Sequence, residues 1–130
     1  MSSSVLDASA ALAYLQGESG AGRVEEALAA GAVLSVVNLA EVVTKLAADG
    51  LSNEAVRASI GVLRAETAVF DEADALSTGL LRPVTRPFGL SLGDRACVAL
   101  ALSRGLPVLT TDRAWQDIGS ILDVDVEVIR

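Results

Sequence analysis

Histidine is absent from the 130 residues of the chain, and cysteine and lysine each occur once. Without histidine, the Ser-His-Asp and Cys-His mechanisms and every histidine-ligated metal site are excluded. The single cysteine, Cys97, excludes an intrachain disulfide and a cysteine-rich zinc cluster. Because Cys97 lies in the wholly apolar run 96–102, we expect a buried thiol rather than a nucleophile. Chemistry must therefore come from carboxylates, hydroxyls, amides and arginines.

Aromatic residues and long apolar segments are also scarce. The chain has one Trp, one Tyr and two Phe, although 52% of its residues are hydrophobic. Its core must be built from Ala, Val, Leu and Ile, which suits helices packed on a mostly parallel sheet. No run approaches the ~20 apolar residues of a membrane span, and the start of the chain lacks a basic region. We therefore expect a soluble cytoplasmic protein that does not contact a membrane.

The length of the chain suits one domain, residues 1–130, which can bury a core without disulfides or a structural metal. The net charge of −7 argues against capture of nucleic acid by a broadly basic surface. Metal ions and local arginines can still reverse the field at one site. All basic residues except Lys45 are arginines, which suit a planar, bidentate grip on phosphate.

Buried strands and amphipathic helices alternate along the chain, which predicts a three-layer α/β/α sandwich around a mostly parallel sheet of about five strands. We expect strands at residues 5–7, 32–37, 67–70, 107–110 and 124–129. Helices are expected at residues 8–16, 23–30, 39–49, 52–65, 72–81 and 91–104. Asn38 is a good N-cap for the third helix, and Ser91 with Asp94 resembles a capping box. Two prolines and a glycine predict a loop at residues 82–90.

Four acidic residues are expected to meet at one edge of this sheet. Asp7 ends the first strand, and Glu41 lies in the first turn after the second. Asp94 begins the helix that leads into the fourth strand, and Asp112 follows that strand. These positions share the edge where parallel strands end, which is where such folds bind ligands. Two carboxylates ~4 Å apart repel by about 4 kcal/mol at an effective dielectric of 20, a repulsion that a cation removes. Oxygen ligands favour Mg²⁺ or Mn²⁺.

Each acid also has a purely structural interpretation. Asp7 is able to cap the following helix, and Asp94 to complete the capping box. Glu41 precedes Lys45 by four residues, the preferred spacing for a surface ion pair. Asp112 suits a turn. Further acids follow the third strand or lie after the fourth, so geometry alone does not select the ligands: Asp71, Glu72, Asp74 and Asp117.

Each member of the quartet stands in a short motif, and the four occur in order. They are Val5-Leu6-Asp7-Ala8-Ser9-Ala10, Leu34 to Val42, Gly89 to Asp94 and Pro107 to Asp112. With these motifs the chain resembles, over nearly its whole length, the PIN-domain ribonucleases, and most closely the VapC-type toxins of VapBC toxin–antitoxin pairs. The region between residues 50 and 87 carries no motif of this kind.

The resemblance implies an endoribonuclease that depends on Mg²⁺ or Mn²⁺ and acts on RNA. It implies that the quartet holds the metal and is catalytic, that Ser9 supplies an accompanying hydroxyl, and that Thr110 or Thr111 assists. It also implies a cognate antitoxin and a homodimer. Four arginines flank the expected site and are candidate contacts for RNA phosphates, although solvation or ion pairing is the alternative for each: Arg82, Arg86, Arg95 and Arg113.

Two other functions fit parts of the sequence. One is a PIN-like module that binds RNA or protein without catalysis, which the intact quartet disfavours. The other is a phosphoryl-transfer domain of receiver or haloacid-dehalogenase type, which also has Asp after its first strand. Such domains usually need a second acid near Asp7 and a lysine at a late strand, whereas the only lysine here lies in the third expected helix. Glycine-rich nucleotide-binding motifs are absent.

Overall fold

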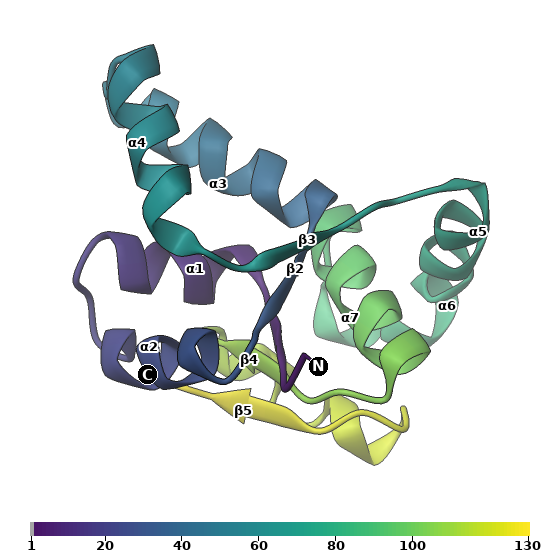
Figure 1. Cartoon of the computed structure of the whole chain (residues 1–130). Helices are drawn as coiled ribbons and strands as arrows, with labels where there is room; N and C mark the ends of the chain where they lie inside the picture. The colour runs from purple at the N-terminus through teal and green to yellow at the C-terminus, as the bar shows by residue number, and fades with distance from the viewer. Residues whose placement is uncertain (1) are drawn as a thin grey trace.

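Five parallel strands form one sheet in the order β3-β2-β1-β4-β5 (Figure 1). The computed structural model describes residues 2–130. The strands are β1 Val5–Leu6, β2 Val33–Ser35, β3 Glu66–Ala68, β4 Val108–Thr110 and β5 Val126–Val128. β1 lies at the centre, so the exits of β1, β2 and β4 are neighbours.

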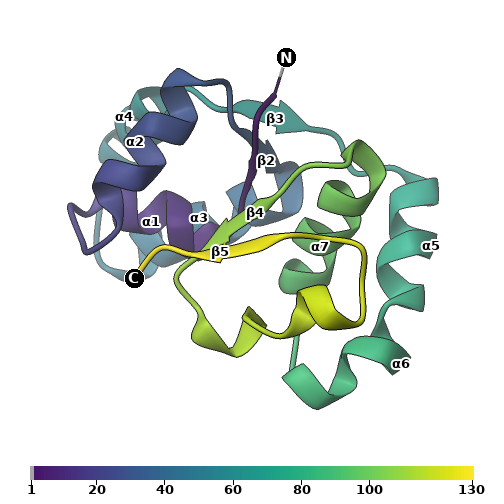
Figure 2. The ribbon, with the colours of Figure 1, turned by 90° about the horizontal axis from the view of Figure 1, so that it is seen from below.

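Seven α-helices and three short 3-10 helices cover the sheet over residues 2–130. The α-helices are α1 Ala8–Leu15, α2 Ala21–Ala29, α3 Val36–Ala48, α4 Asn53–Leu63, α5 Glu72–Leu80, α6 Arg82–Thr85 and α7 Leu92–Arg104. The 3-10 helices are η1 Arg86–Phe88, η2 Arg113–Trp115 and η3 Ile118–Ser120. Figure 2 shows α1 to α4 on one side of the sheet and α5 to α7 on the other. The three-layer prediction is confirmed.

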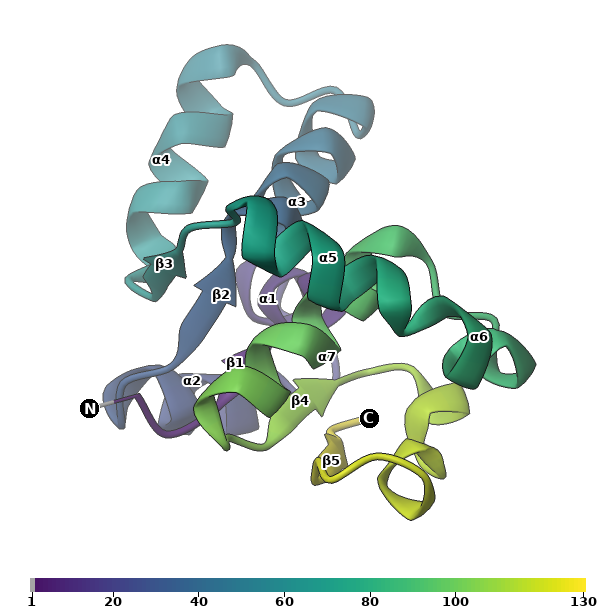
Figure 3. The same ribbon diagram turned by 90° about the vertical axis from the view of Figure 1, so that its right-hand side faces the viewer.

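Alternation along the central strands supplies two cores, because successive side chains of a strand point to opposite faces. The leucines of these strands enter one core and the valines the other: Leu6, Leu34 and Leu109 against Val5, Val33 and Val108. The leucine core is closed by α1 to α4, and the valine core by α7 and Trp115. Figure 3 shows α5 lying outside α7, which shields this second core from solvent.

Two local predictions are wrong. The third helix begins at Val36 and is capped by Ser35, whose Oγ accepts a hydrogen bond from the Val37 N–H at 3.2 Å, so Asn38 is not the N-cap. The expected loop at residues 82–90 instead contains α6 and η1. Pro83 and Pro87 each occupy the second position of these helices, where a missing N–H breaks no helical hydrogen bond.

Several smaller expectations are confirmed. Ser91 and Asp94 form the capping box of α7, and Gly105 ends that helix in a left-handed conformation. Cys97 is fully buried, and burial raises the pKa of its thiol well above the ordinary value. Within residues 2–130, no helix combines the length and apolar character needed to cross a membrane.

Candidate active site

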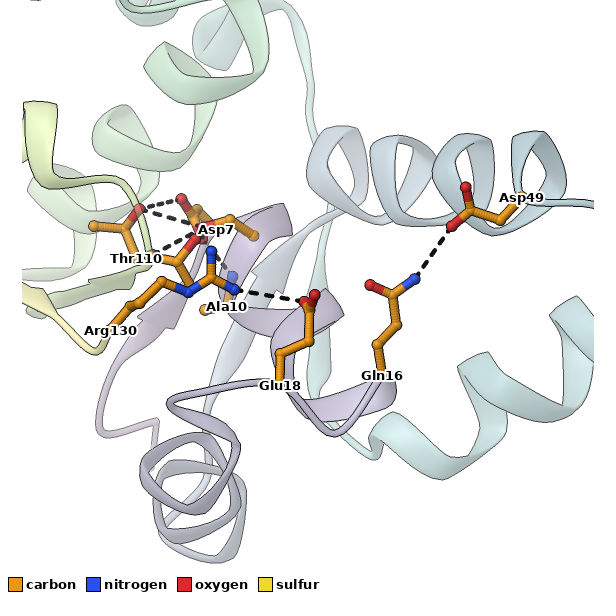
Figure 4. A network of polar contacts seen from close by, with 9 residues as sticks. Asp7, Ala10, Gln16, Glu18, Asp49, Thr110 and Arg130 are labelled. Atoms are coloured by element: carbon orange, nitrogen blue, oxygen red, sulfur yellow. Dashed lines mark hydrogen bonds and ion pairs between the residues drawn. The ribbon is translucent and has the colours of Figure 1, made fainter.

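Asp7 is the most buried acid at the sheet edge, with 4% of its surface exposed. It caps α1, because its Oδ1 accepts the Ala10 N–H at 2.8 Å. The Ser9 hydroxyl donates to the same oxygen at 2.7 Å, and the Thr110 hydroxyl donates to Oδ2 at 2.5 Å (Figure 4). Both carboxylate oxygens are therefore fixed by groups from α1 and β4.

The same two hydroxyls tie the exit of β4 to the exit of β1. Ser9 Oγ accepts the Thr111 N–H at 2.9 Å, and Thr110 Oγ1 accepts the Asp112 N–H at 3.1 Å. Each hydroxyl thus donates to Asp7 and accepts a backbone N–H from the chain beyond β4. Thr111 contributes its backbone to this network, and the Asp112 backbone is one hydroxyl away from the Asp7 carboxylate.

The Asp7 carboxylate is poorly solvated, and this changes its pKa. Burial raises its pKa from 3.8 to about 6. Hydrogen bonds from Thr110, Ser9 and Ala10 oppose this rise, and the negative charge of Asp94 adds to it. The rise therefore comes mainly from loss of solvent around the buried carboxylate, and the charge of Asp94 makes a smaller contribution.

Asp94 serves as a cap and faces the same site. Its Oδ2 accepts the Ser91 N–H at 2.9 Å, and its own N–H donates to Ser91 Oγ at 3.1 Å. Its other oxygen has no hydrogen-bond partner among residues 2–130. The capping interpretation is therefore correct for Asp94, but it occupies only one of the two oxygens.

Glu41 enters the site from α3 and is not paired with Lys45. Lys45 Nζ instead contacts Asp49 Oδ1 at 2.8 Å. Asn38 Nδ2 donates to Glu41 Oε1 at 2.7 Å and to the Gly93 carbonyl at 2.9 Å. The side chain that the sequence suggested as a cap therefore connects Glu41 to the start of α7.

The pKa of the buried Cys97 thiol indicates that three of the acids lie near one another. Burial is the main cause of the raised pKa of this thiol, and the charges of Asp7, Asp94 and Glu41 add to it, so these three carboxylates lie near the same part of α7. Asp112 is outside this group. Its side chain is exposed, and its Oδ1 caps η2 by accepting the Ala114 N–H at 2.9 Å.

Two of the four rival acids pair with each other, and the other two are exposed. Asp71 and Asp74 form the capping box of α5, in which each side chain accepts the other residue's N–H at 2.9 Å. Glu72 and Asp117 are exposed. Of the four predicted acids, Asp7, Asp94 and Glu41 lie near one another, whereas Asp112 is linked to Asp7 only through its backbone N–H and the Thr110 hydroxyl.

The donor set suits a hydrated divalent cation. All candidate ligands are oxygen atoms, and the Asp94 charge lies close enough to Asp7 to contribute to its raised pKa. No group of three acids or thiols among residues 2–130 is arranged to hold an ion by itself. Mg²⁺ commonly keeps several waters and takes only one or two carboxylates, so this arrangement fits Mg²⁺ or Mn²⁺ better than a cation that needs a dehydrated cage.

The arginines divide into two groups. Arg82, Arg86 and Arg113 are exposed. Arg95 is half-buried, and its Nη1 donates to the Thr78 carbonyl at 3.2 Å, so its guanidinium connects α7 to α5. Arg95 therefore has a packing role between these helices, and its contact with an RNA phosphate stays a prediction.

Sequence reasoning missed Asn38 as a site residue, and it also missed Arg130. Arg130 follows β5 at the same sheet edge, because the preceding Ile129 N–H donates to the Thr110 carbonyl at 2.9 Å. Its guanidinium contacts Glu18 at 3.6 Å, an exposed pair (Figure 4). The sequence feature that could have drawn attention to Arg130 is a basic residue directly after the last expected strand.

The fold is that of a PIN domain. The family model of the PIN domain matches residues 4–121, so the chain belongs to the PIN domain family. This confirms the resemblance found in the motifs. A comparison with curated proteins found no match.

Solved structures of VapBC complexes are similar over nearly the whole chain. A chain of DNA-bound VapBC from Salmonella typhimurium is 23% identical, with 98% of both chains covered and a TM-score of 0.74. A chain of VapBC2 from Rickettsia felis, bound to a promoter fragment, is 15% identical, with 95% of this chain and 96% of that chain covered and a TM-score of 0.73. A chain of VapBC-5 from Mycobacterium tuberculosis is 25% identical, with 97% and 98% covered and a TM-score of 0.63.

Proposed function

We propose that the chain is an endoribonuclease dependent on Mg²⁺ or Mn²⁺, and the toxin of a type II toxin–antitoxin pair. The observation that carries the proposal is the buried carboxylate of Asp7, whose pKa rises to about 6 beside Asp94 in a PIN domain. Strongly perturbed acids in convergent polar sites are typical of catalytic centres. The likeness to chains of VapBC complexes supports the toxin assignment.

The four acids would act together as ligands of the metal. Asp7, Glu41, Asp94 and Asp112 would hold one or two divalent ions, partly through water. A bound ion would activate water for attack on a phosphodiester bond and neutralise charge that develops on the phosphoryl oxygens. Asp7 keeps its position in this scheme, because Ser9 and Thr110 together with the α1 backbone occupy both of its oxygens.

The acids that keep one oxygen without a hydrogen-bond partner are the candidates for proton transfer. Asp94 and Asp112 each use one oxygen as a helix cap, and neither second oxygen has a hydrogen-bond partner among residues 2–130. Either is able to accept a proton from the attacking water. Ser9 and Thr110 orient Asp7 and remain available to the substrate only through rearrangement of their hydrogen bonds.

RNA is the proposed substrate, and a cognate antitoxin is the proposed protein partner. Two of the VapBC structures matched above are bound to DNA. A net charge of −7 suits a partner that presents a basic segment to the acidic site. A second copy of the chain is the further proposed partner, as expected from the resemblance.

The competing function is a non-catalytic PIN-like module. One observation favours it: no three acids among residues 2–130 are arranged to hold an ion by themselves, which a module that has lost catalysis would also exhibit. The two functions differ in a single property, cleavage of RNA by the protein free of any partner.

Replacing Asp94 by asparagine is expected to lower the rate of RNA cleavage by at least about 100-fold. Asparagine retains an oxygen for the Ser91 N–H and therefore the cap, but it loses the charge. The measurement is cleavage of structured RNAs with Mg²⁺ or Mn²⁺ by protein purified without a partner. Asp74→Asn is the matched control, because Asp74 holds the equivalent position in the capping box of α5. Equal cleavage by Asp94→Asn and wild type would contradict the assignment.

Replacing Arg95 by alanine is expected to lower the free energy of unfolding by about 1–2 kcal/mol, since a charged hydrogen bond between helices is lost. The salt dependence of RNA binding should stay unchanged. Arg113→Ala, which removes an exposed arginine beside Asp112, should reduce the salt slope by about one. Urea unfolding and titration of a single-stranded RNA at several salt concentrations measure both effects. If Arg95→Ala instead reduces the salt dependence of RNA binding, Arg95 contacts RNA and the expectation is wrong.

A further inference from the structure

We propose that Asn38 and Gly93 are positioning residues that hold the Glu41 carboxylate in place for the reaction. This inference rests on the proposed function. Asn38 lies one helical turn before Glu41 on α3, and Gly93 is the second residue of α7. The two residues contact Glu41 from different helices, so they fix it relative to both.

The hydrogen bonds of Asn38 define its orientation. Its side chain is 1% exposed, and Nδ2 donates both to Glu41 Oε1 at 2.7 Å and to the Gly93 carbonyl at 2.9 Å. Both partners are acceptors, so a flipped amide would set three oxygens against one another. The Oδ1 of Asn38 is buried without a partner among residues 2–130. A buried amide with one unpaired polar atom destabilises a fold. The two hydrogen bonds that Asn38 Nδ2 donates therefore explain why an amide stands at this position.

Gly93 makes room for the Glu41 carboxylate. A Cβ at residue 93 would overlap Glu41 Oε1, Oε2 and Cδ. The backbone of Gly93 is helical and needs no special conformation, and alanine would favour the helix more. Close approach of Glu41 is therefore the feature that requires glycine at this position.

Without these two contacts, the Glu41 side chain could adopt other conformations. A groove runs between α3 and the start of α7, and Glu41 and Gly93 lie on its wall together with Thr44, Lys45 and Leu92. A long, half-buried side chain on the wall of a groove has several accessible rotamers. Asn38 and Gly93 select one of them before any ligand binds, which is the preorganisation that an electrostatic site needs.

The inference predicts that Gly93→Ala weakens Mn²⁺ binding by about tenfold or more, as is typical when a residue that orients a ligand is changed. The fold should tolerate the change, because the displaced atoms are the end of a flexible side chain. Gly22→Ala is the matched control: Gly22 is the second residue of α2, and an added Cβ there meets nothing within 4 Å. Mn²⁺ affinity is measured by calorimetry, and stability by urea unfolding in metal-free buffer.

A double-mutant cycle tests whether Gly93 acts through Glu41. In a Glu41→Ala background, Gly93→Ala should change the Mn²⁺ affinity by less than about twofold, because the carboxylate that it displaces is gone. A tenfold loss in that background as well would overturn the inference in favour of a general structural effect. Asn38→Leu, which removes the donor and the unpaired acceptor together, should weaken Mn²⁺ binding without lowering stability.

Failure of the inference and failure of the proposed function give different results. If the wild-type protein cleaves RNA and Gly93→Ala binds Mn²⁺ as wild type does, the positioning role is overturned and the nuclease stands. If wild type cleaves no RNA but Gly93→Ala weakens Mn²⁺ binding only where Glu41 is present, the nuclease is overturned and the positioning role stands. Equal affinities of the two proteins, or no binding by either, overturn the inference.

Discussion

Replacing Asp7 by asparagine is expected to lower RNA cleavage by about 10³-fold or more while making the fold more stable at neutral pH. Asparagine has nearly the same shape, and its oxygen is able to accept the Ala10 N–H and the Ser9 hydroxyl, so the cap of α1 persists. Its amide would then donate to Thr110 Oγ1, and the Thr110 hydroxyl proton would turn toward Ser9 Oγ, which lies 3.4 Å away. Only the charge is lost, and with it the affinity of the site for a cation.

The gain in stability follows from the pKa of Asp7, which rises from 3.8 to about 6 on folding because the carboxyl is buried. Between these values the folded protein binds a proton that the unfolded chain has released. The free energy of unfolding therefore falls as the pH rises from about 4 to about 6, and it stays lower above that range. The full difference corresponds to about 3 kcal/mol. Asparagine does not titrate, so the variant should be more stable than wild type by about 1–3 kcal/mol at pH 7.

Urea unfolding of wild type and Asp7→Asn at several pH values, in buffer with a chelator, measures this effect. The difference between the two proteins isolates Asp7, since they share every other titrating group. Asp117→Asn, at an exposed acid, should follow the wild-type pH dependence. A wild-type protein that is the more stable of the pair at pH 7.5 would contradict the expectation.

The fold followed from sequence because its signals are short-range and repeated. Continuous apolar segments mark strands buried on both faces, and the alternation of leucine and valine in β1, β2 and β4 feeds two cores. The start of α3 was missed for a specific reason. Ser35 and Asn38 are both good caps three residues apart, and local preference does not choose between them. The choice depends on Gly93, 55 residues further along the chain, which accepts a hydrogen bond from Asn38.

The placement of Asp7 and Asp94 at one edge of the sheet was predictable from sequence, but the hydrogen bonds around them were not. Topology brings Asp7 and Asp94 to one edge, and a sequence can specify that topology through its pattern of elements. The sharing of the Ser9 and Thr110 hydroxyls between Asp7 and the backbone beyond β4 depends on atomic distances between segments about a hundred residues apart.

Arg95 illustrates the limit of arguments from proximity in sequence. It follows Asp94 directly, and it was therefore expected at the same site. Successive side chains on a helix point about 100° apart, so neighbours in sequence face different surroundings. Asp94 faces the acidic cluster, while Arg95 reaches Thr78 on α5.

Binding of a divalent cation is expected to stabilise wild-type protein strongly, and its removal to abolish cleavage. Without a cation, the charges of Asp7, Asp94 and Glu41 act on the same buried region of α7. A cation that binds only the folded chain stabilises it by about 2.7 kcal/mol at 100 times its Kd, which corresponds to roughly 10 °C in Tm for a chain of this size. Thermal unfolding with Mn²⁺ or Mg²⁺, and cleavage before and after chelation, measure the two effects.

An acidic protein also gains stability from weak, delocalised binding of cations, so the shift alone does not identify the site. Screening by salt at matched ionic strength gives the general contribution, which should be small and should not distinguish Mn²⁺ from a monovalent cation. The site-specific part should vanish in a double variant, Asp7→Asn with Asp94→Asn, which keeps both caps but removes two charges. This variant should begin with a higher Tm than wild type and gain nothing from Mn²⁺, because the repulsion that a cation relieves has been removed by mutation. An undiminished Mn²⁺ shift in the double variant would place cation binding elsewhere on the surface.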